Sequence, residues 1–119
     1  MKRIVNKSDF ESTLKLYYES MAQVWLFNVG HKRLAIRLEL SESNEVLYII
    51  AISCEHITGP FVWQKVRIQI IESINERSSV ITVIKDTNAG FELTSSGGVT
   101  MVIAPKSDFT QSFDNFLDF

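Results

Sequence analysis

Residues 33–40, RLAIRLEL, form the clearest pattern in the chain, and they constrain its fold more than any other feature. Leucine and isoleucine occupy every second position, and Arg33, Arg37 and Glu39 lie between them. Because successive side chains of a β-strand point to opposite faces, this period of two predicts a strand with one apolar face and one solvent-exposed face. The turn-forming residues SESN at 41–44 follow, so we expect the chain to reverse there.

After this turn, residues 45–54, EVLYIIAISC, are apolar on both faces and rich in β-branched residues. That composition predicts a central strand, antiparallel to 33–40. Residues 24–30, VWLFNVG, predict another strand that turns at 30–31. The turn signals TNAG and SSGG separate three further short strands: VITVIKD (80–86), GFELTS (90–95) and VTMVIA (99–104).

Helical periodicity is clearest at the two ends of the chain. Ser8 and Glu11 have the spacing of a capping box, which marks a helix start. The apolar residues behind this box share one helical face: Phe10, Leu14, Tyr17, Tyr18, Met21 and, at its limit, Trp25. The tetrapeptide KSDF recurs at 106–109, and another apolar set there shares one face: Phe109, Phe113, Phe116 and Leu117. The repeat therefore predicts two helix starts rather than a duplicated recognition motif.

Residues 61–76 allow two interpretations. Within WQKVRIQI (63–70), Val66, Ile68 and Ile70 alternate as in a strand. The spacing from Trp63 through Val66 and Ile70 to Ile74 also fits one helical face. The density of β-branched residues favours the strand.

Together these patterns predict one α+β domain that spans residues 1–119. Its core is a meandering antiparallel sheet of about five to seven strands, with an N-terminal and a short C-terminal helix packed on it. A strongly curved sheet or a partial barrel fits the same strand count. The 45% hydrophobic and 22% charged composition is typical of a soluble globular protein, and 119 residues suit a single domain.

Charge and cysteine content exclude several classes of function. The net charge of −2 and a pI near 5.6 argue against non-specific nucleic-acid binding. No apolar run approaches the roughly 18 residues of a membrane span, and MKRIVNKSDFE lacks the apolar stretch of a secretory signal. One cysteine cannot form an internal disulfide, so we expect a cytoplasmic protein.

Residues 52–63, ISCEHITGPFVW, look most like a site of chemistry. On a strand, Cys54 and His56 would lie on one face, but roughly 6.6 Å apart, which is too far for a nucleophile and its base. Cys54, His56 and His31 show no metal-ligand spacing. We therefore expect a structural cysteine, no metal, no cofactor and no catalytic residues.

The same stretch leads into an aromatic and basic segment. If 61–69 is a strand, its aromatic and cationic side chains share one face, which could join the polar face of 33–40. Aromatic residues and arginine are enriched at the centres of protein interfaces. The candidate binding residues are Phe61, Trp63, Lys65, Arg67, Arg33 and Arg37. Two other interpretations stay open: a helix at 109–117 covers the aromatic pair, or the cations lie on a plain solvated face.

Three hypotheses of function follow. The first is a small non-catalytic protein-interaction domain, which binds a protein partner or a second copy of itself, as a homodimer, through this face or an exposed edge strand. The second is a small-molecule-binding module, in which a curved sheet closes over an apolar cavity lined by Tyr48, Trp25, Trp63 and Met101. The third is a small thiol or histidine enzyme, which requires a Cys54 pKa well below about 8.5.

Overall fold

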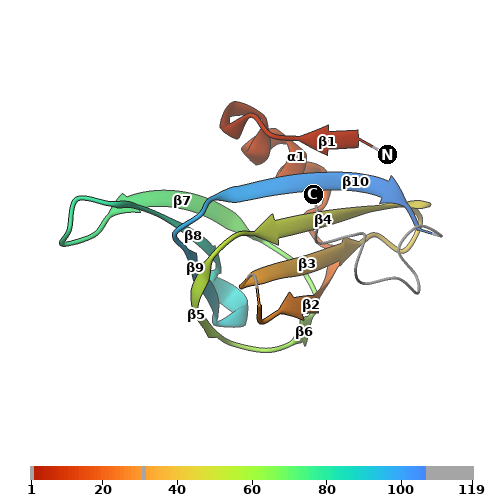
Figure 1. Cartoon of the computed structure of the whole chain (residues 1–119). Helices are drawn as coiled ribbons and strands as arrows, with labels where there is room; N and C mark the ends of the chain where they lie inside the picture. Colours follow the sequence, from red (N-terminus) through yellow and green to blue (C-terminus); the bar gives the residue numbers. More distant parts are fainter. Residues whose placement is uncertain (1, 31, 107–119) are drawn as a thin grey trace.

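The computed structural model describes residues 2–30 and 32–106, which form two antiparallel sheets, one α-helix and two short 3-10 helices (Figure 1). The strands of the six-stranded sheet lie in the order β1 (Lys2–Ile4), β10 (Val99–Pro105), β4 (Glu45–Ala51), β3 (Arg33–Glu39), β2 (Met21–Asn28) and β6 (Val62–Trp63). Those of the four-stranded sheet lie in the order β5 (Cys54–Thr58), β9 (Phe91–Ser95), β8 (Val80–Asp86) and β7 (Gln69–Ile74). The helices are η1 (Lys7–Asp9), α1 (Phe10–Leu16) and η2 (Thr87–Ala89).

A two-stranded ribbon runs through both sheets and joins them at a corner. β4 pairs with β10 in one sheet, and their continuations β5 and β9 pair in the other. At the bend, Ile52 N–H donates to the Gly98 carbonyl at 3.0 Å, and Gly97 N–H donates to the Ile52 carbonyl at 3.0 Å. A Cβ on Gly97 would lie 2.8 Å from the Ile52 carbonyl oxygen, so the close approach of the two chains requires glycine.

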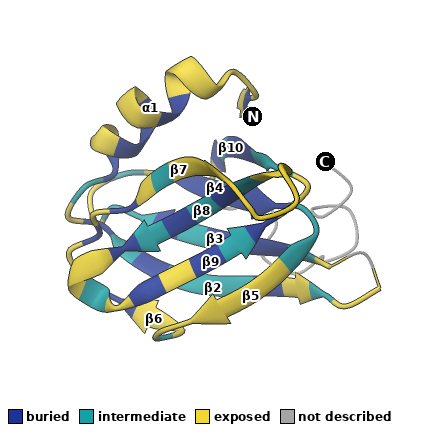
Figure 2. Ribbon diagram, turned by 90° about the vertical axis from the view of Figure 1, so that its left-hand side faces the viewer, coloured by how far each residue is buried: buried dark blue, intermediate teal, exposed yellow. Residues whose placement is uncertain are grey.

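The main core lies between the two sheets. It combines the inward rows of both sheets with the apolar face of α1: Ile36, Leu38, Leu47, Ile49 and Met101; Ile84, Phe91 and Leu93; Phe10 and Leu14. Each fully buried aliphatic side chain stabilises the fold by about 1.5–3 kcal/mol relative to exposure. α1 contacts β7, and it lies at the open side of the molecule where β7 and β10 come together (Figure 2). The sheets therefore form an open two-layer arrangement with a helix across one side.

The central strands confirm the prediction from the alternating pattern. β3 pairs with β2 on one side and with β4 on the other, and β8, β9 and β10 occupy the predicted segments. Residues 69–74 form a strand, so the helical interpretation of 61–76 is wrong. The predicted single sheet is also wrong, because the ribbon bends at 52–53 and its continuations form a second sheet.

The first predicted helix is present but shorter than its apolar pattern. α1 ends at Leu16, and Glu19 has a left-handed φ of 68°. The Glu19 N–H donates to the Val66 carbonyl at 3.1 Å, and β2 then pairs with β3, so Met21 and Trp25 are strand residues. Asp9 rather than Ser8 caps the helix, without a side-chain hydrogen bond, so the capping box is wrong. The helix predicted at 109–117 lies outside the described residues.

Candidate functional site

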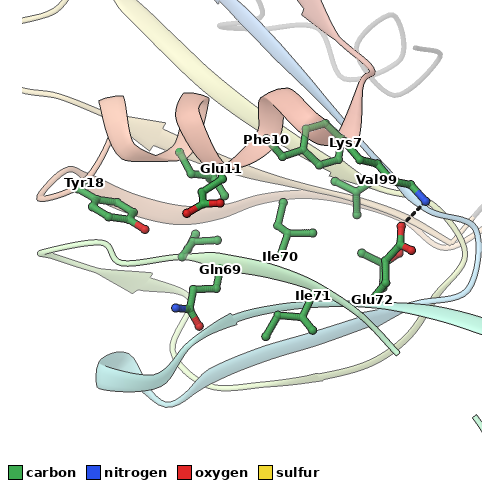
Figure 3. A pocket seen from close by; sticks show the side chains of 12 residues that line it. Lys7, Phe10, Glu11, Tyr18, Gln69, Ile70, Ile71, Glu72 and Val99 are labelled. Carbon is green, nitrogen blue, oxygen red and sulfur yellow. Dashed lines mark ion pairs between the residues drawn. The ribbon is translucent and has the colours of Figure 1, made fainter. Parts of the chain in front are cut away.

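A groove of about 570 Å³ lies between α1 and β7. Phe10 and Leu14 of α1 line one wall, Ile68 and Ile70 line the other, and Val99 lies between them (Figure 3). This volume falls within the range of ligand-binding pockets, and apolar lining with a few polar groups at the margin is typical of them. α1 lines the groove with two side chains because Phe10 and Leu14 are four residues apart, which places them one turn apart on the same face of the helix.

The strand contributes its backbone edge to this groove as well as its side chains. Five consecutive residues, 68–72, line the groove. Since successive side chains of a strand point to opposite faces, consecutive residues can all line a cavity only where it runs along the edge of the strand. Within the described residues, β7 pairs with β8 alone, so its other edge carries backbone N–H and C=O groups without a partner strand.

An ion pair closes one end of the groove. Lys7 Nζ of η1 contacts the Glu72 carboxylate of β7, and both side chains are exposed (Figure 3). An exposed pair of this kind contributes about 0–1 kcal/mol. The contact therefore links the helical segment to the strand weakly enough to open when another group approaches.

The other end of the groove is built from Tyr18 and the segment before β7. The Arg67 guanidinium lies 4.7 Å from the centre of the Tyr18 ring, and its Nε donates to Glu19 Oε1 at 3.1 Å. The Arg67 backbone N–H donates to buried Asp86 Oδ2 at 2.8 Å, and Trp63 Nε1 donates to the same oxygen at 2.9 Å. Asp86 thus holds the 63–67 segment against β8 and places Arg67 beside the groove.

The structure separates the predicted aromatic pair. Phe61 is 75% exposed, whereas Trp63 is 8% exposed and stacks on Phe91 with ring centres 4.5 Å apart. Lys65 has a left-handed φ of 54° and is exposed in the irregular stretch between β6 and β7. The strand predicted across 61–70 is therefore interrupted, and its aromatic and cationic side chains do not share one face.

The predicted cations are also divided between different parts of the molecule. Arg33 and Arg37 belong to β3 in the six-stranded sheet, whereas Arg67 borders the groove through Tyr18. The side chains of Arg37 and Glu39 are 16% and 18% exposed, so the solvent-exposed face predicted for 33–40 is wrong at these positions. The binding role of the six predicted residues stays a prediction, but they do not form one basic surface.

The cavity predicted for a small ligand is not built from its four expected residues. Trp25 and Tyr48 contact each other, with ring centres 5.0 Å apart, in a second cluster on the six-stranded sheet. Met101 and Trp63 belong to the core between the sheets. These residues lie on opposite sides of one sheet, so they do not enclose a common space.

The surroundings of Cys54 suit a structural thiol. Its Sγ donates to the Ala51 carbonyl at 3.6 Å, and burial raises the pKa of the thiol to about 11. A β-bulge separates Cys54 from His56, which is exposed. The raised pKa is opposite to what a nucleophilic cysteine needs. Among residues 2–30 and 32–106, no group of three or more His, Cys, Asp or Glu side chains is placed to hold a metal ion; His31 is outside them.

Sequence reasoning missed the groove. It placed Ile68 and Ile70 on an inward row but did not identify β7 as an edge strand, because pairing order depends on contacts between distant segments. One signal was available: QIIESI at 69–74 carries an isoleucine on each face, Ile70 and Ile71, and follows an irregular, charged stretch. The face with Ile70 needs cover from a second element, here α1.

Comparison with known proteins adds no identification. No family model, no curated protein and no solved structure matches the chain. In the part of the chain that the structure describes, no helix is long and apolar enough to cross a membrane.

Proposed function

We propose that this protein is a non-catalytic protein-interaction domain that binds an extended segment of a partner protein along β7, in the groove between α1 and β7. The observation that carries the proposal is an edge of β7 that has no partner strand among the described residues and lies beside an apolar groove. The proposal keeps the edge-strand mode of interaction and the cytoplasmic setting predicted from the sequence.

An extended segment uses both features of this site. In β-strand addition, main-chain hydrogen bonds to the strand edge supply affinity, and pockets for alternate side chains supply specificity. One row of the partner's side chains would contact Phe10, Leu14 and Ile70 inside the groove. The other row would lie over the opposite face of β7, where Ile71 leaves apolar surface in solvent. A free, partly apolar edge is a favourable template for another strand.

A small apolar ligand is the second candidate. It is favoured by the groove volume of about 570 Å³, which suits a compact molecule. Such a ligand would fill the space between Phe10, Leu14 and Ile70 but leave the backbone edge of β7 unpaired. The two candidates therefore differ in whether β7 backbone amides become protected when the site is filled.

A random dodecapeptide library, displayed on phage and selected against the full chain, tests the proposal. We expect selected peptides to alternate apolar and polar residues and to slow hydrogen exchange of amides within residues 69–74. Ile71→Arg should weaken peptide binding at least tenfold, because Ile71 lines the groove, whereas Ile74→Arg on the same strand should change it less than about twofold. Peptides that bind without protecting β7, or a selection that yields none, would refute the proposal.

A further inference from the structure

A second hollow, of about 520 Å³, lies along the edge strand β1 and another face of the helical segment. Residues 2–6 line one wall, and the other wall is lined by Asp9, Ser12, Thr13 and Leu16. These four residues have the spacing i, i+3, i+4 and i+7, so they share one helical face. Phe10 and Leu14, which line the groove beside β7, project from a different face of α1. α1 therefore separates two hollows, each with its own strand.

β1 contributes a backbone edge to the second hollow. Residues 2–6 are consecutive, and consecutive residues of an extended chain line one cavity only where the cavity runs along the edge of that chain. β1 pairs with β10 on one side and, among residues 2–30 and 32–106, with no strand on the other. It is the last strand of the six-stranded sheet and lies beside α1 (Figure 1). An edge of this kind accepts another extended chain through main-chain hydrogen bonds.

Two cations on β1 have no acidic partner within the described residues. Lys2 and Arg3 are both exposed, and neither forms an ion pair there. Of the residues that line the hollow, Asp9 alone is acidic, so the two cations outnumber the one carboxylate. Because Lys2 and Arg3 are consecutive, they point to opposite faces of the strand. A partner that matches this edge therefore needs a negative charge on each of its two faces.

Exposed apolar side chains accompany these cations. Val5 is 63% exposed and Leu16 is 69% exposed, and both line the hollow. Burial of such side chains by a partner is favourable, at about 25 cal/mol per Å² of apolar surface. A simple anion would leave them in solvent, and a nucleic acid would need more phosphate contacts than two cations supply. The combination of a strand edge, two cations and two apolar side chains fits a polypeptide.

We propose that β1 binds an extended acidic segment of a partner protein, which extends the six-stranded sheet as a new edge strand. Two adjacent acidic residues of this segment lie opposite Lys2 and Arg3, one on each face. An apolar residue next to the acidic pair packs on Val5 or Leu16. The site differs from the groove beside β7, because it selects adjacent carboxylates instead of apolar alternation, and neither proposal requires the other.

A random dodecapeptide library, displayed on phage, tests this proposal when it is selected against the full chain with Ile71→Arg, a change that disfavours binding in the groove beside β7. We expect selected peptides to carry two adjacent acidic residues and to slow hydrogen exchange of amides within residues 2–5, measured by NMR. The double variant Lys2→Gln, Arg3→Gln should weaken their binding at least about fivefold at low ionic strength, because two ion pairs are lost.

The double variant Lys65→Gln, Arg77→Gln is the matched control. It removes the same charge from two exposed residues outside the hollow, so it should change the affinity less than about twofold. Both double variants should melt within about 2 °C of the parent chain, because all four residues are exposed.

Equal losses of affinity in the two double variants would overturn the proposal, as would selected peptides without adjacent acidic residues or without protection of residues 2–5. A selection that yields no peptide would overturn it too. In that case, binding to vesicles of phosphatidylserine and phosphatidylcholine that is lost in Lys2→Gln, Arg3→Gln would assign these cations to a lipid surface. The groove proposal is judged separately, since its peptides are selected on the unaltered chain and protect residues 69–74.

Discussion

The groove between α1 and β7 differs in exposure from the outer face of the six-stranded sheet, which is the face away from the core between the sheets and holds the cluster of Tyr48, Ile50 and Val102. Both are lined by isoleucine and aromatic side chains. Ile71 in the groove is partly exposed, whereas Ile50 on the outer face is fully buried. Side-chain composition therefore does not separate a candidate binding surface from a buried one. What separates them is how far the side chains are exposed to solvent.

The two regions also differ in their backbone. β4, beneath the outer face, is hydrogen-bonded to β10 on one side and to β3 on the other. β7, beside the groove, is paired to β8 on one side only within the described residues. The groove can therefore accept main-chain hydrogen bonds from another segment, whereas the outer face can accept side-chain contacts only.

Truncation of matched isoleucines should produce the largest difference between the two regions. Ile50→Ala should lower the free energy of unfolding by about 3 kcal/mol, because it removes a fully buried side chain and leaves a cavity. Ile71→Ala should cost less than about 1 kcal/mol, because Ile71 is already partly in solvent. Urea denaturation of both variants measures this, and equal losses would break the distinction between a buried face and an open groove.

Removal of the Asp86 carboxylate should have the next largest effect, at the end of the groove. Asp86→Ala leaves the Trp63 indole N–H and the Arg67 backbone N–H without their acceptor, so we expect a loss of about 2 kcal/mol. Asp86→Asn keeps an acceptor oxygen and is the control. Urea denaturation gives the stabilities, and if the two variants are equally stable, Asp86 does not hold the 63–67 segment through these bonds.

High pH should lower the stability of the protein through Cys54, which lies at the corner between the two sheets and not in the groove. Burial raises the pKa of the thiol in the folded protein from 9.0 to about 11, so folding favours the protonated form. The thiol's contribution to stability is therefore present below pH 9 and is lost as pH rises through 11. We expect Cys54→Ser to lose less stability than the wild type between pH 9 and 11 in thermal melts.

The same shift predicts slow modification of the native thiol. At neutral pH a thiol with a pKa near 11 has about a hundredfold less thiolate than one near 9.0. Iodoacetamide should therefore alkylate the folded protein far more slowly than the protein unfolded in urea. Comparable rates in both states would show that Cys54 is not protected in the way its burial indicates.

The smallest expected effect belongs to the ion pair at the groove mouth. Lys7→Met should change the free energy of unfolding by less than about 1 kcal/mol, because both partners are exposed. It should nevertheless alter binding of a selected peptide, since it opens the end of the groove beside Glu72. Isothermal titration measures the affinity, and Lys106→Met is the control, because its ion pair with Glu39 lies outside the groove.

Local patterns predicted the centre of the fold but not its edges. The alternation of 33–40 and the two-sided apolar run after it are properties of single strands, so β3 and β4 could be predicted, together with β8, β9 and β10. The end of α1 could not, because it depends on the bond from Glu19 to Val66, which is distant in sequence. The solvent-exposed face predicted around Arg37 was wrong, because the alternation of residues indicates which side chains are polar but not how far each of them is exposed to solvent.

The candidate site was harder to predict than the fold for the same reason. The row of Val66, Ile68 and Ile70 was visible as an apolar alternation, and the aromatic pair of Phe61 and Trp63 was visible beside it. Whether β7 ends a sheet is decided by strand pairing between distant segments. The left-handed conformation of Lys65, which interrupts the strand predicted across 61–70, also has no signal in residue type.

The pairing of β1 with β10 has a consequence for how the chain is made. Lys2 lies opposite Ile103 in this pair, and β10 also supplies one neighbour of the central strand β4. During synthesis, about one hundred residues must therefore emerge before the first strand and one side of β4 find their partners. Such distant pairing is slow to form, on the order of milliseconds to seconds. Until then, one edge of β4 has no partner strand while the chain is still attached to the ribosome.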